Sequence, residues 1–449
     1  MQNSAITGGV MAGTGGTAAA TARLELLNCL FESNTTSGTT GSRRGGVLLV
    51  ENAGNVTMTN CTFVKNFAHT EAAVVYAQSP NVTTIAFRNS LLYGNRREGS
   101  TVPSNFSFSG GTNPFITQST FVESTVTPNP RFLSYGSSNY ALAQSSPCVN
   151  AGSNLLLPSN VTTDLKENDR VVGAAVDQGC FENQYTANTK IYFVGTSAQG
   201  DSSGINWDNC LSRFQLRDSL ANAPANSQFW LLQGTYKPTY TTIRTRYFTV
   251  PDFVAVYGGF DTDYSAPKER GGGRSTLSGN IGGDDGFFPE IIFDDNSYHV
   301  MKLIDSKSVL LDGLTFERGY ANGTGDENDG GGLFVKYTLP GINALGLFNC
   351  EFRYNFADGV GGGMYCFYEN NSGNSPSNYG AFFKLYNTSF ISNRAGSSGG
   401  GFYYSNNAGN NATDMVNCLF AENTSQNSSG GGLFVSSNLS TGTVRVTNC

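Results

Sequence analysis

The sequence predicts an all-β protein folded as a parallel β-helix, a solenoid in which short strands coil around one apolar core. Three observations predict this fold: a short phrase that recurs along the chain, a glycine run with an apolar segment after most copies, and the composition. Charged residues make up 14% of the 449 residues, aromatic residues make up 12%, and 55 residues are glycine. This composition supplies many tight turns together with enough apolar side chains for a core.

The recurring phrase is an Asn-Cys-like pair, a spacer, an aromatic residue, two further residues and an Asn. Its copies are NCLFESN (28–34), NCTFVKN (60–66), NCEFRYN (349–355), NTSFISN (387–393) and NCLFAEN (417–423), with looser copies NSLLYGN (89–95) and GLTFERG (313–319). Glycine runs begin at Gly45, Gly330, Gly361, Gly399 and Gly430. Neighbouring copies start about 29 to 38 residues apart. Each repeat therefore has room for three short strands: after the glycine run, before the Cys, and around the Phe.

No single repeat can bury its own apolar face. Repeats stacked at the strand spacing of ~4.8 Å bury a continuous core and place equivalent residues in columns. We expect one interior aromatic ladder formed by Phe31, Phe63, Phe352, Phe390 and Phe420. At a corner of the coil we expect an amide ladder formed by Asn34, Asn66, Asn355, Asn393 and Asn423.

The Cys-x-Phe-x-x-Asn phrase with Gly-Gly-apolar runs resembles the repeats of chlamydial polymorphic outer-membrane proteins and related secreted, adhesin-like proteins. The resemblance covers most of residues 1–100 and 312–449, and it implies a right-handed coil and export. Residues 145–154 and 161–182 are similar to the closing segment of such domains, and residues 191–239 resemble their opening segment. The resemblance is specific for the type of repeat and says little about activity.

These likenesses divide the chain into three parts. Residues 1–183 read as the end of a β-helix with its closing cap, residues 184–311 as an opening cap with the first rungs, and residues 312–449 as open-ended repeats. Apolar spacing predicts a short amphipathic capping helix at about 207–223. The segment that resembles a closing cap comes before the segment that resembles an opening cap. We therefore expect the chain to be one period of a tandem or head-to-tail array. A truncated chain is the alternative.

Composition also argues against several classes of function. The net charge is −7, from 27 basic and 34 acidic residues, without a basic stripe. A nucleic-acid partner is therefore not expected. No apolar run approaches the ~18 residues that a membrane-spanning helix needs. The N-terminal MQNSAITGGV does not have the basic start and apolar stretch of a signal peptide.

We expect no catalytic residues, no cofactor and no enzyme activity. The chain has two histidines, His69 and His299. Neither stands in a pattern that pairs a nucleophile or carboxylates with a base. The alternative is activity on carbohydrate, as in polysaccharide lyases and hydrolases, with acidic pairs at 284–285 and 294–295 as candidates. Asp326, Asn328 and Asp329 are candidate ligands for Ca²⁺, although this loop lacks the EF-hand pattern and reads better as a solvated acidic turn.

Seven of the nine cysteines fall into two groups. Those in the repeat phrase, such as Cys29 and Cys61, occupy a small buried ladder position, or they bridge adjacent rungs if their Cα atoms lie about 5 Å apart. Cys148 and Cys180 stand in the closing segment, where the resembling proteins usually carry a small residue. A disulfide between these two cysteines is predicted, and it would imply export.

Surface features suggest contact with sugars. Outward aromatic residues, Tyr403 or Tyr404 and Phe367 or Tyr368, are candidates for binding surface glycans. Sequons also make glycosylation an expectation. The glycosylation candidates are Asn34, Asn55, Asn81, Asn105, Asn160, Asn322, Asn387, Asn411, Asn423 and Asn438.

The function expected from the sequence is that of a structural subunit of an extracellular filament or cell-surface appendage. Copies or tandem repeats would stack rung on rung, so the main partner is the protein itself. Two alternatives stay open. One is a secreted β-helix that acts on or binds carbohydrate, and the other is an adhesin in which the coil is a stalk.

Overall fold

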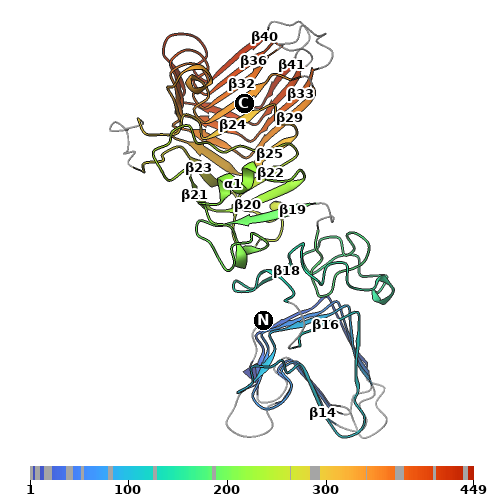
Figure 1. Ribbon diagram of the computed structural model, residues 1–449. Coiled ribbons are helices and arrows are strands. Elements are labelled where there is room, and N and C mark those ends of the chain that lie inside the picture. The colour runs from blue at the N-terminus through green and yellow to red at the C-terminus, as the bar shows by residue number, and fades with distance from the viewer. Residues whose placement is uncertain are drawn as a thin grey trace. The chain divides into compact units, whose positions relative to one another are not determined.

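The structure, a computed structural model, describes residues 4–5, 11–14, 23–36, 44–51, 55–78, 84–124, 129–184, 189–262, 264–283, 294–339, 341–369, 379–407, 411–437 and 443–449. The chain divides into two compact units, Met1–Ala187 and Asn188–Cys449. Both are built mainly from parallel sheets, which confirms the predicted all-β class (Figure 1). Strands from the predicted parts 184–311 and 312–449 enter the same sheets of the second unit.

In the first unit, consecutive strands enter different sheets, and strands about one repeat apart pair in parallel. We call one passage of the chain through the four sheets a rung. The four sheets contain β2 (Met11–Thr14), β6 (Leu48–Glu51), β10 (Val75–Gln78) and β14 (Phe106–Ser109); β3 (Arg23–Leu27), β7 (Asn55–Thr59), β11 (Thr84–Arg88) and β15 (Phe115–Gln118); β4 (Leu30–Glu32), β8 (Thr62–Val64), β12 (Leu91–Tyr93) and β16 (Phe121–Val122); and β1 (Ser4–Ala5), β5 (Thr35–Thr36), β9 (Phe67–Ala68) and β13 (Arg96–Arg97).

After these rungs the chain forms an antiparallel hairpin and a largely irregular closing segment. The hairpin pairs β17 (Phe132–Ser134) with β18 (Asn139–Leu142), and a short 3₁₀ turn, η1, spans Asn154–Leu156. The closing segment lies along one corner of the rungs. Its backbone there accepts hydrogen bonds from the Asn28 and Asn89 side chains.

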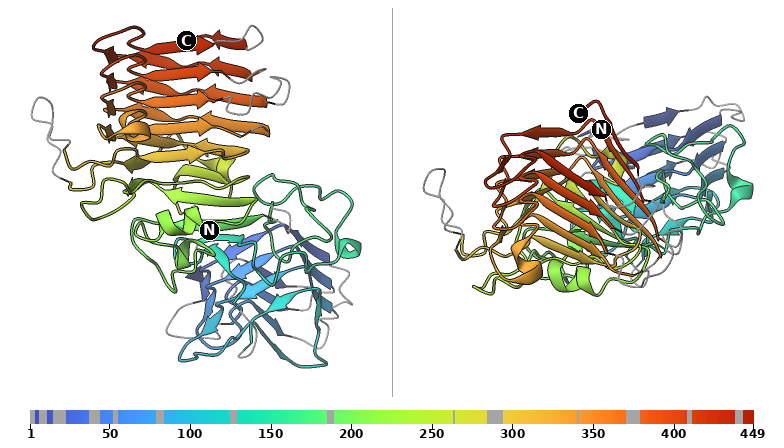
Figure 2. Two further views of the ribbon diagram at one scale, coloured as in Figure 1. Left: turned by 45° about the horizontal axis from the view of Figure 1, so that its top comes forward. Right: turned by 90° about the horizontal axis from the view of Figure 1, so that it is seen from above.

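The second unit repeats the four-sheet arrangement, and its rungs stack in order along the coil (Figure 2). Its sheets contain β19 (Lys190–Val194), β20 (Ser227–Leu232), β22 (Ala255–Phe260), β25 (Val309–Asp312), β29 (Gly341–Phe348), β33 (Tyr379–Tyr386), β37 (Asn411–Val416) and β41 (Thr443–Thr447); β21 (Gly234–Tyr236), β23 (Ser275–Ser278), β26 (Leu314–Glu317), β30 (Glu351–Arg353), β34 (Ser389–Ile391) and β38 (Leu419–Ala421); β24 (Met301–Ile304), β28 (Leu333–Tyr337), β32 (Met364–Tyr368), β36 (Phe402–Asn406) and β40 (Leu433–Ser437); and β27 (Tyr320–Ala321), β31 (Phe356–Ala357), β35 (Arg394–Ala395) and β39 (Thr424–Ser425).

Each complete rung has four strands, whereas three were predicted. The additional strand follows the ladder Asn and is two residues long, as in β9 and β31. Two residues are too short to show the alternation of apolar and polar residues that marks a strand in a sequence. Parallel pairing with the same strand of the neighbouring rung supplies its hydrogen bonds.

The predicted helix at about 207–223 is wrong in extent. A 3₁₀ turn, η2, covers Trp207–Asn209, and the α-helix α1 covers Leu216–Ala221. Between them Leu211 makes backbone hydrogen bonds to Phe193 and Gly195 at 2.8 Å, which interrupts the helix. Two further 3₁₀ turns are η3 (Pro267–Glu269) and η4 (Gly325–Asn328).

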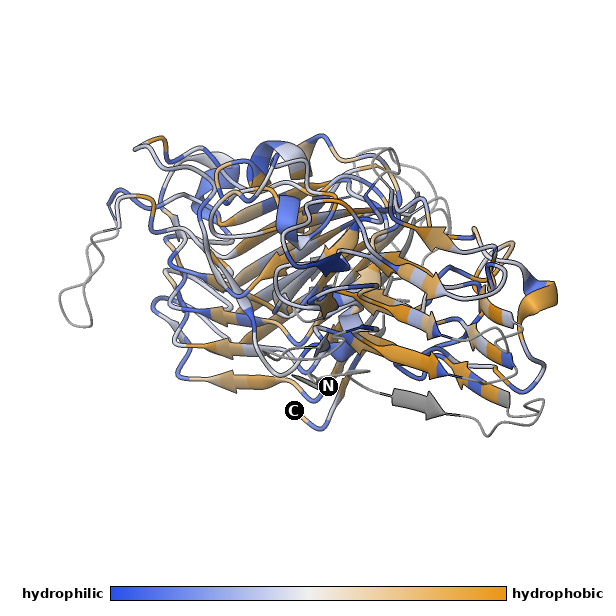
Figure 3. Cartoon of the chain, turned by 90° about the horizontal axis from the view of Figure 1, so that it is seen from below, coloured by the Kyte–Doolittle hydropathy of each residue, from blue (hydrophilic) through white to orange (hydrophobic). Residues whose placement is uncertain are grey.

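Apolar residues gather on the strands and polar residues in the connections (Figure 3). Inside the second unit, inward positions of successive rungs form columns of fully buried side chains, for example Val335, Cys366 and Tyr404. Among the described residues, no helix has both the length and the apolar character needed to cross a bilayer.

Candidate functional site

The corner amides of the second unit form a continuous hydrogen-bonded ladder. The Asn393 side chain donates to Asn423 Oδ1 at 3.0 Å and to the Phe352 carbonyl at 2.9 Å. Its own Oδ1 accepts the backbone and side-chain N–H groups of Asn355 at 3.1 and 3.0 Å. Asn393 is 1% exposed. The ladder therefore ties each rung to the next, and the buried amide of Asn393 uses both of its N–H donors and both carbonyl lone pairs.

The first unit contains an equivalent ladder. Asn34 donates to Asn66, Asn66 to Asn95, and Asn95 to Asn105, at side-chain distances of 2.9, 2.9 and 3.1 Å. The sequence-based ladder included Asn34 and Asn66 but not the last two residues. Asn95 ends a looser copy of the phrase and was detectable on that ground. Asn105 lies outside any copy, so only the fold identifies it.

The predicted interior phenylalanines form two stacks, one in each unit, instead of a single ladder. Phe31 stacks on Phe63 with ring centroids 4.9 Å apart, and Leu92 takes the next position of that column. In the second unit four rings stack with centroid distances of 4.7, 4.8 and 5.0 Å. They are Phe316, Phe352, Phe390 and Phe420. Phe316 was missed in the ladder because its phrase, GLTFERG, has neither the Asn-Cys pair nor the final Asn.

The Cys position of the phrase holds a small hydrogen-bond donor. Ser90 Oγ lies 3.1 and 2.9 Å from the carbonyl oxygens of Met58 and Arg88, which belong to the preceding rung and to its own rung. Thr388 and Cys350 contact the equivalent pairs of carbonyls. This explains why Cys, Ser and Thr interchange here, since each supplies a small donor where the chain turns.

Cys29 and Cys61 occupy this position in adjacent rungs, and both are free thiols. A hydrogen bond from the Cys61 thiol lowers the Cys29 pKa from 9.0 to about 7, against an opposing effect of burial. Burial raises the pKa of Cys61 well above its ordinary value and raises that of Cys350 to about 12.

We expect Cys29 to react with iodoacetamide at neutral pH faster than Cys350. The thiolate is the nucleophile, so the rate should rise with pH around a midpoint near 7. Peptide mass spectrometry after timed labelling measures both rates. The substitution Cys61→Ala removes the hydrogen-bond donor and should move the midpoint upward towards 9.0. An unchanged midpoint in that variant would contradict this assignment.

The disulfide predicted between Cys148 and Cys180 does not form in the structure, because both residues are free and buried. The backbone N–H of Cys180 donates to Thr62 Oγ1, while that of Cys148 donates to Ser146 Oγ. Each cysteine is thus packed in its own environment. Burial raises the pKa of both thiols to about 12.

A buried cluster of charged side chains around Arg170, and not a disulfide, stabilises the closing segment. The Arg170 side chain is 1% exposed and donates to the carbonyls of Asp177 and Gly179 at 3.1 and 2.6 Å. Its other terminal nitrogen lies 3.9 Å from Glu182 Oε2. Burial raises the pKa of Glu182 to about 8, and the neighbouring Asp177 carboxylate adds to this shift.

The candidate calcium residues do not converge on a common point. Asp326 lies 3.4 Å from the amino groups of Lys302 and Lys336, and Asp329 accepts the Val360 backbone N–H at 2.8 Å. Gly359 donates to the Asn328 carbonyl. Ammonium groups already neutralise Asp326. Within the described segments, no group of three or more His, Cys, Asp or Glu side chains is placed to hold a metal ion.

The candidates for enzymatic groups are dispersed. His299 is completely buried, and burial lowers its pKa to about 4. His69 and Glu98 both belong to the first unit, where Nδ1 of His69 contacts the Glu98 carboxylate. The acidic pair 284–285 lies outside the described residues.

The aromatic candidates for sugar binding separate into inward and outward residues. Tyr368 and Tyr404 face the core and are each 1% exposed. Tyr403 belongs to an outward column and stacks on Tyr365 and Phe434, with centroids 5.7 and 5.0 Å apart. Phe367 is also partly exposed. Neighbouring rings of the column cover one another's faces, so mainly their edges remain for a ligand.

Several predicted glycosylation sites are incompatible with the fold. Asn34 and Asn105 are 1% and 6% exposed, and the amides of Asn34 and Asn423 are ladder groups. A glycan on any of these amides would prevent the ladder from forming. Asn322 is half-buried and accepts a hydrogen bond from Arg244. Asn55, Asn160 and Asn387 are exposed, whereas Asn81, Asn438 and the Asn411 side chain lie outside the described residues.

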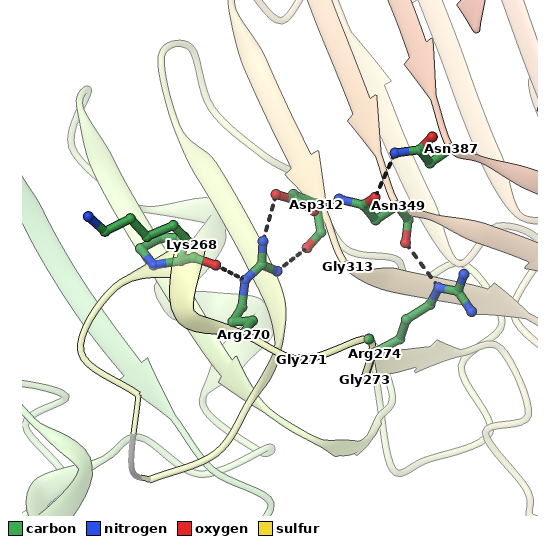
Figure 4. A pocket seen from close by; sticks show the side chains of 11 residues that line it. Lys268, Arg270, Gly271, Gly273, Arg274, Asp312, Gly313, Asn349 and Asn387 are labelled. Carbon is green, nitrogen blue, oxygen red and sulfur yellow. Dashed lines mark hydrogen bonds and ion pairs between the residues drawn. The ribbon is translucent and has the colours of Figure 1, made fainter. Parts of the chain in front are cut away.

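A groove of about 710 Å³ lies on a corner of the second unit (Figure 4). One side is the turn that contains Lys268, Arg270 and Gly271–Gly273, and the other is the corner at Asp312 and Asn349. Arg270 pairs with Asp312 at 2.6 Å. Further lining residues include Arg274, which donates to the Asn349 carbonyl at 3.0 Å, and Asn387.

No family model and no curated protein matches this chain.

Proposed function

We propose that this protein is a structural, extracellular β-helix whose rungs stack from one repeat or copy onto the next in a filament or cell-surface appendage. In this proposal the coil is a right-handed parallel β-helix, as the likeness to the chlamydial repeats implies. Right-handed crossovers between parallel strands are strongly favoured in proteins, which supports this hand.

The observation that carries the proposal is the outer edge of the rung formed by β38–β41. Val446 is 52% exposed although the equivalent residues of the inner rungs, Met415 and Leu385, are completely buried. Val435 is 42% exposed in a column whose next members are buried. Among the described residues β41 pairs with β37 alone, and a further rung with the same pattern would cover these side chains and continue the parallel pairing.

The amide ladder also supports stacking of another repeat on this edge. Inside the coil, the backbone N–H of each ladder Asn donates to Oδ1 of the next rung, as Asn355 does to Asn393 and Asn393 to Asn423. Another rung that carries the recurring phrase would place an Asn Oδ1 at the backbone N–H of Asn423. The edge therefore suits a copy of the same repeat.

Electron microscopy and intact mass of native material test this function. We expect filaments, and the mass separates a covalent tandem array from stacked chains of 47.8 kDa. For stacked chains, Val446→Asp should disperse the assemblies in sedimentation velocity. Ile304→Asp, an exposed apolar position on the outward face of β24, is the matched control and should leave them intact. Dispersed native monomers of 47.8 kDa would refute the proposal.

The alternatives share the coil but need a different site. A carbohydrate-active or carbohydrate-binding protein would use the groove or the outward aromatic column, and the covered ring faces of that column make it a poor stacking platform for sugars. An adhesin stalk would use the same ladders as a spacer. The filament is preferred because the exposed edge matches the repeat itself.

A further inference from the structure

The first residue of the recurring phrase forms a second column of asparagines, on the outside of each unit. In the first unit these residues have φ values of 50°, 53° and 47°, and in the second unit 52°, 50° and 55°. The two columns therefore have the same backbone conformation at equivalent turns. We call them the outer rows. They comprise Asn28, Asn60 and Asn89 in the first unit and Asn349, Asn387 and Asn417 in the second.

In the first unit the outer row is a docking platform for polypeptide. Asn89 engages Ser153 on both sides of its amide, since Oδ1 accepts the Ser153 N–H at 2.8 Å and Nδ2 donates to the Ser153 carbonyl at 3.0 Å. Asn28 donates to the Thr163 carbonyl at 2.8 Å. Asn60 and Asn89 are 1% and 0% exposed under this cover.

In the second unit the equivalent amides are exposed. Among the described residues, these side-chain amides bond to one another and to Asp312, with distances of 2.9 Å from Asn349 to Asp312, 3.2 Å from Asn387 to Asn349 and 3.3 Å from Asn417 to Asn387. An amide has two N–H donors and two carbonyl lone pairs. The Asn387 amide thus has one further N–H donor and one further carbonyl lone pair for a ligand. Asn89 uses one donor and one acceptor in the same way when it binds the backbone of Ser153.

The groove beside this row offers a charged amino group and several backbone N–H groups as hydrogen-bond donors. Lys268 is exposed, and the structure gives it no ion pair within the described segments. The backbone N–H groups of Gly271, Gly272 and Gly273 likewise have no acceptor among the described residues. Of the lining side chains only Asp312 is acidic, and Arg270 neutralises it. The groove therefore favours an anionic ligand although the chain as a whole has a charge of −7.

We propose that the outer row and groove of the second unit bind a polypeptide segment of another chain that presents backbone amides and carboxylate side chains. The amides of Asn387 and Asn417 would pair with its peptide groups, as Asn89 does with Ser153. Lys268 and the glycine turn would receive its carboxylates. This surface lies on the side of the coil, so its binding does not depend on the proposed stacking of rungs.

Fluorescence anisotropy with a labelled Ser-Asp repeat peptide tests the proposal on the full chain, produced without N-glycans so that Asn387 is free. We expect the wild type to bind this peptide and to bind a Ser-Asn repeat peptide at least tenfold more weakly. Lys268→Glu and Asn387→Asp should each weaken binding of the Ser-Asp peptide at least tenfold. Lys384→Glu, an exposed lysine outside the groove, should leave the affinity unchanged.

Three outcomes would overturn the proposal. The first is an affinity unchanged by both groove substitutions, and the second is equal binding of the charged and uncharged peptides. The third is tighter binding of a short oligogalacturonate that both groove substitutions abolish, because the groove would then be a polysaccharide site. Circular dichroism of every variant checks its folding. Sedimentation of the same variants shows whether stacking is unaffected, which keeps the two proposals separate.

Discussion

The substitution Asn393→Asp should destabilise the second unit by about 3 kcal/mol at pH 7, because the carboxylate cannot donate to the Phe352 carbonyl or to Asn423 Oδ1. Leaving the buried Phe352 carbonyl unpaired costs about 2 kcal/mol, and losing the bond to the half-buried Asn423 amide costs about 1 kcal/mol. Urea denaturation followed by circular dichroism measures the loss. Asn417→Asp, the same change in the exposed outer row, should alter stability by no more than about 0.5 kcal/mol.

The Asn393→Asp variant should also depend on pH in a defined direction. Burial raises the pKa of the new carboxyl above its ordinary value of about 3.9, so the folded state binds a proton more readily than the unfolded state. Lowering the pH from 7 towards 4 should therefore restore part of the lost stability. A deficit that is constant with pH would show that the carboxyl is not buried in the ladder.

Gly363→Ala should destabilise the second unit by about 3 kcal/mol, because the new methyl group overpacks the space between two rungs. A Cβ at this position would lie 2.5 Å from the Gly401 carbonyl oxygen and 3.0 Å from Asn393 Cγ. Neither is the free end of a flexible side chain, so the rungs themselves would have to separate.

Gly272→Ala is the matched control, since a Cβ there has no neighbour within 4 Å. Its urea midpoint should equal that of the wild type. If Gly363→Ala were as stable as this control, the rungs would not be in the close contact described at the glycine run. Hydrogen exchange would then show no loss of protection in β32 and β36.

The period of the sequence was sufficient to predict the ladders. A phrase that returns with every turn of a coil brings equivalent residues together, so the asparagines of 387–393 and 417–423 align without knowledge of anything else in the fold. The same reasoning predicted one ladder of phenylalanines where the structure has two stacks, because Phe63 and Phe352 belong to separate units. Pairwise stacking depends on adjacent rungs, and the period alone does not say which rungs are adjacent.

The local sequence also indicated where the coil turns. Asn tolerates the left-handed conformation better than most residues, which suits positions such as Asn349 and Asn417 with φ of 52° and 55°. The Cys position was expected to be small and buried. Its hydrogen bonds to two carbonyls became visible only in the structure, because one of the acceptors belongs to another rung.

Tertiary structure alone decided the features that lie beside the coil. The predicted disulfide failed because Cys148 and Cys180 find separate partners, and the predicted helix was cut short because Leu211 is drawn into a backbone contact with β19. The groove was not predictable either, since Arg274 and Asn387 are distant in sequence and line the same groove only when the rungs stack. A repeating sequence determines the contacts that repeat. Contacts made once, by an irregular segment against the coil, depend on where the whole chain places that segment.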